Sequence, residues 1–446
     1  MTIPANHRWK HAYHFTLIDN LESIIENGIL CTNIKNSRKI SHKNVAEEGI
    51  QSRRNTMLVP CSDGKYVHDY VPFYFSKRNP MQLGVINKKN IDQPFIIYLA
   101  IPISVFETKA GVVFTDASAN TDVPPNFYNS ANLDQLETLN WTAINEKKWG
   151  CPNDDYRHQK MAELLFPEKV DISDIAYIVV WNESIKRKVE EIFSQKGKNP
   201  PPIRFDEDHY YINFYEGERQ SIVTGPILLK HNVDKTIASI CKNFHANPRF
   251  ANIETALNAI NNYFSAIKEL NDIDGLQANY GPHSDDVGMH SRRVVSLLTN
   301  FPEFNTLSDS DKNIVTLSAY LHDIGKGPKS RWPNEVMSKA DNDHAAKSLP
   351  MLKRILTEDI GGLDAETVRK IVMLVTYDDL VGDIVARGRH EEQLFNVIKS
   401  ESDVNMLVAL GKADMFAIKQ EWVYLNNVAI ENLKQRAISS LSTDVT

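Results

Sequence analysis

The sequence predicts a multidomain α+β protein, in which a mixed α/β domain is followed by an all-α helical bundle. The chain has 446 residues, more than one hydrophobic core usually organises. Its first 210 residues alternate short β-rich runs with short helical patterns, whereas apolar residues recur at helical spacing from residue 283 onward. We therefore expect domains at 1–213 and 281–446, with 214–280 as a connector and first helices.

The N-terminal half begins with a strand and a helix. Residues 12–16 (AYHFT) predict a short strand, and Asp19 or Asn20 caps a helix that Gly28 closes. Further β-rich runs are bounded by turn residues and lie at 71–76, 95–101, 175–181 and 209–214. The last of these follows a polar loop at 195–204, and the connector is expected to become helical from Lys235 onward.

Composition points to an ordinary soluble protein. Hydrophobic residues make up 42% and charged residues 24% of the chain. No apolar run approaches the ~20 residues that span a bilayer, and the N-terminus does not have the apolar stretch of a signal peptide. Four cysteines are widely spaced without a CxxC pair, which favours free thiols; they are Cys31, Cys61, Cys151 and Cys241. These features predict a cytoplasmic protein without a membrane partner.

Charge is distributed unevenly along the chain. Residues 1–100 hold thirteen Lys and Arg against eight Asp and Glu, a balance of +5. Because the whole chain has a net charge of −7, the remaining residues carry a net charge of −12. A basic segment in an acidic protein favours a local anionic partner such as nucleic acid or a pyrophosphate. A solvated charged face is the alternative interpretation.

The C-terminal third carries a metal-ligand pattern around LHDIGK at 321–326. A histidine precedes the His322-Asp323 pair at His290, and an aspartate follows at Asp414 inside an apolar helical run. Divalent metals need imidazoles and carboxylates that converge on one point, and helices of a bundle can supply them. An aspartate on an apolar face is costly unless it is paired or bound to a metal.

This pattern, with its order His, His-Asp, Asp, resembles the HD-domain phosphohydrolases. The resemblance implies a Mn, Mg, Fe or Zn ion held by His290, His322, Asp323 and Asp414, with His344 as the additional ligand of a second metal. Lys326 would lie near a substrate phosphate. Where two-metal members have a later histidine, this chain has Asp378 and Asp379. Carboxylates can bind Mg²⁺ or Mn²⁺, so two metals, one metal and a binding-only domain all stay open.

Four phrases of the N-terminal half carry the other chemical signal. They are YHFT at 13–16, IQSRR at 50–54, HDYVPFYFSKRNPM at 68–81 and RHQKMAELLFP at 157–167. The last contains Glu163 between basic and apolar residues, a pattern that places the carboxylate at the mouth of a core. No glycine-rich phosphate loop is present, which disfavours a Rossmann-type dinucleotide site.

These phrases, in this order over residues 10–213, resemble the DarT-type ADP-ribosyltransferases, which use NAD⁺ to modify thymidine in single-stranded DNA. The resemblance implies that Glu163 is catalytic and that His14 and Thr16 hold the nicotinamide-ribose side of NAD⁺. Arg54 would act with Glu163 and contact the NAD⁺ phosphates, and Arg53 is the alternative if the register slips by one.

The expected chemistry suits these residue types. A carboxylate can stabilise the oxocarbenium-like ribose that forms as nicotinamide leaves, and hydrogen-bond its 2′-hydroxyl. The same carboxylate or a neighbour can take the proton of a weak amide nucleophile such as thymine N3. The planar fork of an arginine binds a pyrophosphate through two parallel hydrogen bonds.

Cations and aromatic residues beside these phrases are candidates for nucleic-acid contacts. We expect phosphate contacts from Arg157, Lys160, Lys77 and Arg78. A base can stack on Tyr156 or on an aromatic residue of 73–75, although 71–75 is first of all a buried strand. Residues 102–149 match no pattern that we can assign, so the acceptor, including DNA versus RNA, stays open.

We therefore expect an NAD⁺-dependent DNA ADP-ribosyltransferase of toxin or phage-defence type, with an HD domain in a regulatory or phosphohydrolase role. The alternative is a metal-dependent nucleotide phosphohydrolase or phosphodiesterase with an N-terminal nucleic-acid-binding domain. In a third, non-catalytic hypothesis, the HD half binds a nucleotide and restrains the transferase.

Overall fold

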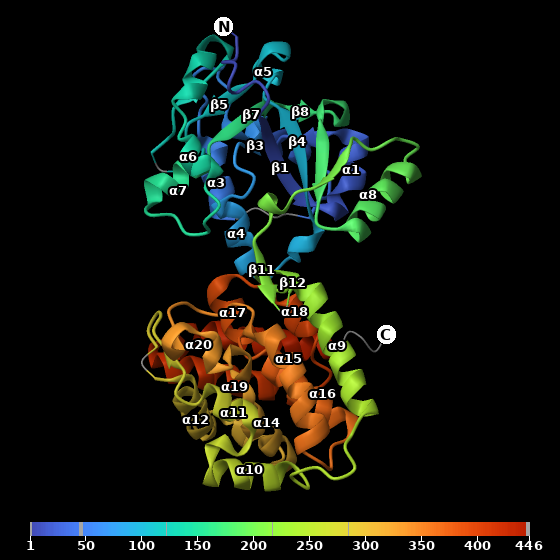
Figure 1. The fold of residues 1–446 in the computed structure, drawn as a ribbon, viewed down its shortest axis with the longest axis vertical. Helices are drawn as coiled ribbons and strands as arrows, with labels where there is room; N and C mark the ends of the chain where they lie inside the picture. The colour runs from blue at the N-terminus through green and yellow to red at the C-terminus, as the bar shows by residue number, and fades with distance from the viewer. Residues whose placement is uncertain (1, 44–47, 122, 216, 284, 443–446) are drawn as a thin grey trace. The chain divides into compact units, whose positions relative to one another are not determined.

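A computed structural model describes residues 2–43, 48–121, 123–215, 217–283 and 285–442 (Figure 1). The chain forms two compact units, Met1–Asn87 with Ile91–Ile222, and Lys88–Asn90 with Val223–Thr446. The first unit contains a mixed sheet with helices, and the second is helical. The fold class predicted from the sequence is confirmed.

The first unit is built on a sheet that, in the described residues, has eight strands in the order β10-β9-β4-β1-β3-β7-β5-β6. Its strands are β1 (His11–Leu17), β3 (Tyr70–Tyr74), β4 (Ile96–Pro102), β5 (Val113–Thr115), β6 (Phe127–Tyr128), β7 (Glu163–Pro167), β9 (Tyr177–Val180) and β10 (Ile203–Phe205). β9 and β10 are parallel, and the other neighbours run antiparallel. The central strands are rich in β-branched and aromatic residues buried on both faces, which such strands favour.

In its described residues, the first unit also contains short helices and two small strand pairs. The helices are α1 (Leu21–Asn27), α2 (Thr32–Ser37), α3 (Glu48–Thr56), α4 (Pro80–Asn87), α5 (Val105–Thr108), α6 (Trp141–Asn145), α7 (Asp154–Lys160) and α8 (Glu183–Gln195). The strand pairs are β2 (Ile29–Leu30) with β8 (Lys169–Val170), and β11 (Ile212–Tyr215) with β12 (Glu218–Ser221). As predicted, α1 ends at Gly28, whose φ of 78° lies in the region that glycine adopts without a steric cost.

The end of the first unit differs from the sequence prediction. The expected strand at 209–214 begins later, at Ile212, and Glu207–His209 form a 3-10 helix instead. Between them, Tyr210 and Tyr211 are consecutive yet both buried. Their hydroxyls donate to the carbonyls of Ile96 and Asn79, at 3.1 and 2.8 Å. A regular strand would place one of the two rings on the opposite face. The edge of the main sheet is instead β10, inside the segment expected to be a polar loop.

The second unit is a helical bundle. Its helices are α9 (Pro226–Lys242), α10 (Ile253–Asn262), α11 (Lys268–Ile273), α12 (Val287–Leu297), α13 (Pro302–Asn305), α14 (Asp309–Leu321), α15 (His344–Arg354), α16 (Ala365–Thr376), α17 (Leu380–Arg387), α18 (Glu392–Phe395), α19 (Glu401–Ile418) and α20 (Gln420–Leu441). A short parallel pair, β13 (Gln277–Ala278) and β14 (Val336–Met337), accompanies them. The prediction that the helix begins at Lys235 is wrong, because Gly225 and Pro226 form a favourable helix start nine residues earlier.

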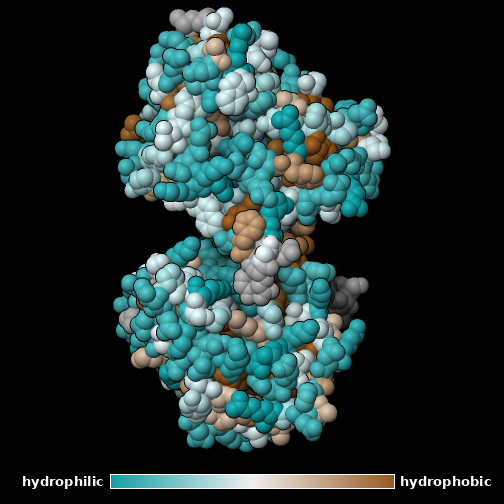
Figure 2. Space-filling view, viewed as in Figure 1, coloured by the Kyte–Doolittle hydropathy of each residue, from teal (hydrophilic) through white to brown (hydrophobic). Residues whose placement is uncertain are grey.

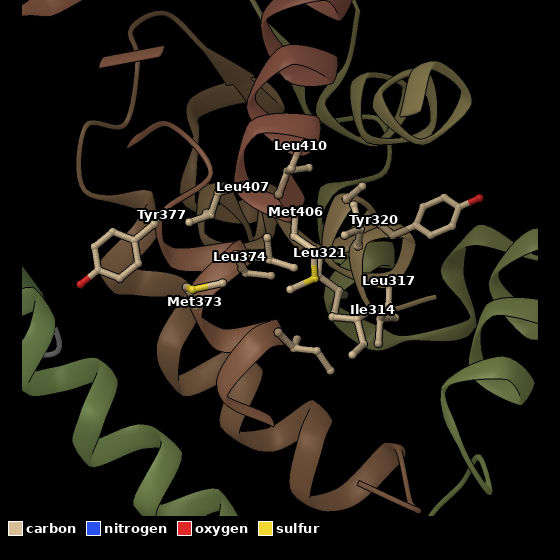
Figure 3. Close-up of a cluster of buried hydrophobic side chains, with 14 of the residues drawn as sticks. Ile314, Leu317, Tyr320, Leu321, Met373, Leu374, Tyr377, Met406, Leu407 and Leu410 are labelled. Carbon is tan, nitrogen blue, oxygen red and sulfur yellow. The ribbon is translucent and has the colours of Figure 1, made fainter. Parts of the chain in front are cut away.

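Three helices supply much of the core of the second unit. Side chains of α14, α16 and α19 point toward one another, among them Leu317, Leu374 and Met406 (Figure 3). α19 is buried along most of its length and carries one polar residue of the expected metal site, Asp414. The core therefore holds rigid the helices from which the site is built.

The described surface is mostly hydrophilic, with scattered apolar residues (Figure 2). No helix in the described part of the chain combines the length and apolar character needed to cross a membrane. The four cysteines all lie within the described residues and are free thiols.

Candidate active site and candidate metal centre

Glu163 and Arg54 form a buried ion pair in the first unit. Glu163 is the first residue of β7 and is 0% exposed, and Arg54 lies near the end of α3. The two guanidinium nitrogens Nη1 and Nη2 donate to Oε1 and Oε2 of Glu163, each at 2.9 Å. Burial alone would lower the pKa of Arg54, but the carboxylate of Glu163 raises it above its ordinary value. The two side chains thus meet in a planar, two-pronged fork.

The backbone around Glu163 fixes its carboxylate further. The amide of Ala119 donates to Oε1 at 3.0 Å, and the amide of Glu163 donates to the hydroxyl of Thr115 at 3.1 Å. The carboxylate is therefore hydrogen-bonded on two sides, as a buried charge requires. Sequence analysis did not identify Thr115 or Ala119, since their contact with Glu163 spans more than forty residues of chain.

Arg54 lies in the wall of a cavity of about 580 Å³. Its lining also includes His14, Thr16, His68 and Tyr74. Tyr74 is the sheet partner of Glu163 on β7 and of Tyr13 on β1, so the register of three adjacent strands leads from the carboxylate to the β1 residues. The cavity has the size of a small-molecule site, and its polar lining suits a nucleotide.

His14 and Thr16 are held in place at this cavity. Nδ1 of His14 donates to the carbonyl oxygen of Pro72 at 2.9 Å, and burial lowers the pKa of His14. A neutral imidazole with this tautomer presents Nε2 as an acceptor. The hydroxyl of Thr16 accepts a hydrogen bond from Asn20 at 3.1 Å. Arg53, the alternative to Arg54, is exposed and donates to the carbonyl of Asn120 instead.

The expected nucleic-acid contacts fall into two groups. Arg157 is exposed on α7 and pairs with Asp154 at 3.2 Å, and Tyr156 is half-buried beside it. The half-buried Lys77 pairs with Asp206 at 2.7 Å. The side chains of these three residues reach solvent and can contact a nucleic-acid strand.

Lys160 and Arg78 have a different position from the one expected. Lys160 is 2% exposed, and its ammonium donates to the carbonyl of Glu146 at 2.6 Å. Arg78 donates to the carbonyls of Lys147 and Tyr210. A direct phosphate contact from Lys160 does not agree with this burial; both cations hold the backbone ahead of α7 instead.

The aromatic strand residues also divide. Phe73 and Phe75 are buried within the core of the first unit, as the alternative interpretation of 71–75 proposed. Tyr74 is the residue of this group that lines the cavity, where its hydroxyl donates to Sδ of Met81 at 3.1 Å.

Four residues of the second unit converge as the HD resemblance implies. His290 lies on α12, His322 and Asp323 follow the end of α14, and Asp414 lies on α19. Nε2 of His290 is 2.8 Å from Oδ1 of Asp414, and Nε2 of His322 is 3.4 Å from Oδ2 of Asp323 and 3.7 Å from Asp414. The ligand atoms of His290, His322 and Asp414 lie within 4.8 Å of one another, and so do those of His322, Asp323 and Asp378. His322 therefore belongs to two overlapping groups, each of which could face a cation.

A second group lies beside the first. Nε2 of His344, the first residue of α15, is 3.5 Å from Asp378 and 3.8 Å from Asp379. It is also 3.9 Å from Oδ1 of Asp323, so Asp323 connects the two groups. The aspartates between α16 and α17 thus take the place where the sequence had suggested a missing histidine.

The residues present fit a divalent cation. In the described part of the chain, Nε2 of His322 and Oδ1 of Asp378 are buried without a hydrogen-bond partner, a costly state unless a ligand completes it. Nδ1 of His322 and of His344 donates to the carbonyls of Ala319 and Asp341, so Nε2 is the nitrogen of each ring that could face a metal. Nitrogen and carboxylate donors suit Mn, Fe, Zn or Mg.

The electrostatics of the centre reflect its crowded charges. Burial opposes the charged form of every group, yet Asp323 and Asp414 raise the pKa of His322 well above its ordinary value. The ammonium of Lys326 lies 2.7 Å from Asp323 and holds the pKa of that carboxyl well below its usual range, against the effect of burial. Despite burial, Asp378 and Asp379 raise the pKa of His344 to about 9.

One residue of this centre was missed by sequence analysis. Lys89, in the short segment Lys88–Asn90 of the second unit, places its ammonium 3.4 Å from Asp379 and from Asp383. The sequence signal was limited to its membership of the basic first hundred residues, which gives no partner.

Comparison with known proteins gives two family matches. A family model described as ssDNA thymidine ADP-ribosyltransferase, DarT, matches residues 13–212, and one described as HD domain matches residues 287–392. A DNA ADP-ribosyl transferase of Thermus aquaticus is 31% identical over 205 residues, which are 45% of this chain and 88% of that relative.

Two solved structures are similar to the N-terminal half. Thermus sp. 2.9 DarT in complex with ADP-ribosylated ssDNA is 29% identical, with 47% of this chain and 99% of that chain covered and a TM-score of 0.42. The same protein in complex with NAD⁺ is 26% identical, with 47% and 100% covered and a TM-score of 0.40.

Proposed function

Because this chain belongs, through residues 13–212, to the DarT family of single-stranded DNA thymidine ADP-ribosyltransferases, we propose that its first unit transfers ADP-ribose from NAD⁺ to thymidine in single-stranded DNA. The HD resemblance of the C-terminal part is also confirmed. We propose 1–213 as the transferase domain, 214–280 as the connector and 281–446 as the HD domain. A toxin or phage-defence role fits an enzyme that modifies DNA bases.

The ion pair of Arg54 and Glu163 beside the cavity is the observation that carries the proposal. In the reaction, the bond between the ribose C1′ and nicotinamide breaks, and its electron pair leaves with nicotinamide. A bond forms between C1′ and a thymine ring nitrogen, whose proton passes to a base. In this proposal the Glu163 carboxylate stabilises the positive ribose and hydrogen-bonds its 2′-hydroxyl.

The other cavity residues have binding roles in this proposal. His14 and Thr16 hold the nicotinamide-ribose side of NAD⁺. Arg54 positions Glu163, and its guanidinium attracts the NAD⁺ phosphates. Arg157, Lys77 and Tyr156 contact the strand, whereas Arg78 and Lys160 shape the segment ahead of α7. We also propose a cytoplasmic location, where NAD⁺ and single-stranded DNA are both available.

Mass spectrometry of oligonucleotides tests the proposal. Single-stranded DNA of varied sequence, and RNA of the same sequences, is incubated with NAD⁺ and the full chain. We expect a mass gain of one ADP-ribose on thymidine-containing DNA, and none with Glu163→Gln. Absence of any gain on DNA from a folded protein would contradict the proposed activity, and a gain on RNA alone would change the acceptor.

For the second unit we propose a divalent-metal centre with a phosphohydrolase or regulatory role. Oδ1 of Asp378, which is buried without a hydrogen-bond partner, favours it. A bound metal would activate water and neutralise phosphate charge. In this proposal Lys326, whose ammonium donates to Asp323, would also bind the phosphate. A nucleotide is the ligand class that we propose for it.

Metal analysis with a phosphatase screen separates these roles. Wild-type protein should retain Mn²⁺, whereas Asp323→Ala should not. Hydrolysis of nucleotides that Asp323→Ala abolishes supports the enzymatic role. Transferase activity that changes with Mn²⁺ in the wild type alone supports the regulatory role, and no retained metal argues against both.

A further inference from the structure

Lys89 reaches the HD centre from the transferase half of the sequence. Residues Lys88–Asn90 belong to the second unit, whereas the residues on either side of them, Asn87 and Ile91, belong to the first. Lys89 is 9% exposed, and Nζ lies 3.4 Å from Oδ2 of Asp379. Three consecutive residues of the chain thus belong to the second unit, and the ammonium of the middle one is buried beside the carboxylates of Asp379 and Asp383.

The backbone of this segment is held in an unfavourable conformation. Lys89 has a φ of 56°, in the left-handed region that side chains other than Gly and Asn rarely adopt. The side-chain amide of Gln393 donates through Nε2 to the backbone carbonyl of Lys89 at 2.9 Å. Strained backbone that surrounding contacts enforce is concentrated at functional sites, which indicates that the position of this ammonium matters.

Asn90 contributes further contacts of the segment. Its Nδ2 donates to the carbonyl of Gly388 at 2.9 Å, and its Oδ1 accepts from the amide of His390 at 2.8 Å. The segment is therefore bound to residues 388–393 through the backbone of Lys89 and the side chain of Asn90.

Charge compensation at the two aspartates is unequal. Asp383 has arginine partners, Arg387 at 3.2 Å and Arg389 at 3.5 Å, besides Lys89. Asp379 is paired with Lys89 and, at 3.8 Å, with His344 of the second metal group. Removal of Lys89 would therefore affect Asp379 most, and Asp379 is a candidate metal ligand.

We propose that Lys89 is a competing cation at the group formed by His344, Asp378 and Asp379, so that a divalent ion binding there displaces its ammonium. The unpartnered Oδ1 of Asp378 indicates independently that this group takes a ligand. An ammonium and a divalent ion cannot share the Asp379 carboxylate without strong repulsion in a buried site. The inference rests on the metal role proposed above.

Displacement would act on the segment that carries Lys89. Residues 88–90 continue directly from α4, whose second residue, Met81, lines the transferase cavity. Metal binding in the second unit would thus release a segment that is covalently joined to a helix of the first.

Calorimetric titration of the full chain with Mn²⁺ tests the competition. Lys89→Met keeps the length and backbone demands of the side chain but removes its charge, and should bind Mn²⁺ about tenfold more tightly. Lys89→Arg keeps the charge and should bind no more tightly than wild type. Lys230→Met, at a lysine on α9 paired with Asp234 at 2.9 Å, is the control and should match wild type.

Hydrogen exchange provides a measurement on the wild-type protein itself. Mn²⁺ should accelerate exchange at residues 88–93 in the wild type, and the change should be smaller in Lys89→Met. Equal Mn²⁺ affinity of wild type and Lys89→Met, or no change in exchange, would overturn the role of Lys89 alone. Failure of every variant and of the wild type to bind Mn²⁺ would instead overturn the metal role on which it rests.

Discussion

Arg54 and Glu163 lie 109 residues apart in the sequence and meet in a two-pronged ion pair, with both N–O distances at 2.9 Å. Both side chains are buried, so water cannot take the place of either partner in the pair. A carboxylate held in this way is already oriented and needs little reorganisation when charge develops on a neighbouring ribose. The pair therefore links the stability of the first unit to its proposed chemistry.

Glu163→Gln should reduce DNA labelling by about two to three orders of magnitude. The amide keeps the shape of the side chain but removes the charge that stabilises the ribose. Labelling is measured as nicotinamide release and as oligonucleotide mass, with circular dichroism as the control for folding. Full activity in Glu163→Gln would exclude this carboxylate as the catalytic group.

Arg54→Ala should destabilise the first unit by about 3–5 kcal/mol, because it leaves a buried carboxylate without its cation. Arg53→Ala is the matched control on the same helix, since Arg53 is exposed, and its effect should stay within about 0.5 kcal/mol. Urea denaturation measures both. A similar loss in the two variants would show that the ion pair contributes no special stability.

Arg157→Ala and Lys160→Met should separate binding from architecture on one helix. Arg157 is exposed, so its loss should weaken binding to single-stranded DNA and lower the salt-dependence slope by about 0.7. Lys160 is buried on a backbone carbonyl, so its loss should lower the melting temperature instead. Fluorescence anisotropy at several salt concentrations and thermal melts distinguish them; an unchanged melt in Lys160→Met would contradict its assigned position.

The stability of the first unit should fall as the pH falls below about 6.5, the ordinary pKa of histidine. Burial lowers the pKa of His14, His68 and His209, so the unfolded chain binds more protons than the folded unit in this range. Their contribution is complete above pH 6.5 and is lost toward the lowered pKa values. Urea midpoints from pH 8 to 5 measure it, and His209→Phe should reduce the slope. A flat profile would contradict neutral buried histidines.

Local signals explain what the sequence predicted well. The strand at 12–16 and the helix closed by Gly28 depend on alternation and on one left-handed residue, which are readable in a short window. The candidate metal ligands could be singled out because an aspartate such as Asp414 is conspicuous within an apolar helix. Each of these features can be recognised from the residues next to it in the sequence.

Long-range partners explain what the sequence did not predict. Lys160 resembles a surface cation in sequence, and only the loop carbonyl that it meets reveals its burial. Lys89 acquires its role from Asp379, almost three hundred residues away. Tyr210 and Tyr211 looked like strand residues because their hydroxyl partners lie in distant segments. Packing of this kind cannot be read from periodicity.

Gly325→Ala should impair the metal centre without changing any proposed ligand. A Cβ at Gly325 would lie 1.9 Å from the carbonyl oxygen of His344 and 2.9 Å from the amide nitrogen of Ser348. The start of α15 would have to move, and overpacking of this kind typically costs about 1–3 kcal/mol. Since His344 is the first residue of that helix, Mn²⁺ affinity at its group should fall together with stability.

Gly84→Ala is the matched control for this substitution, because a Cβ at Gly84 on α4 meets no atom within 4 Å. Alanine there should be neutral or raise stability by about 0.4–1 kcal/mol through the unfolded chain, with Mn²⁺ binding unchanged. Calorimetry with Mn²⁺ and thermal melts of both variants give the comparison. If Gly325→Ala binds Mn²⁺ as the wild type does, Mn²⁺ binding does not depend on the close approach between residue 325 and α15. The assignment of His344 as a ligand would then lose its structural support.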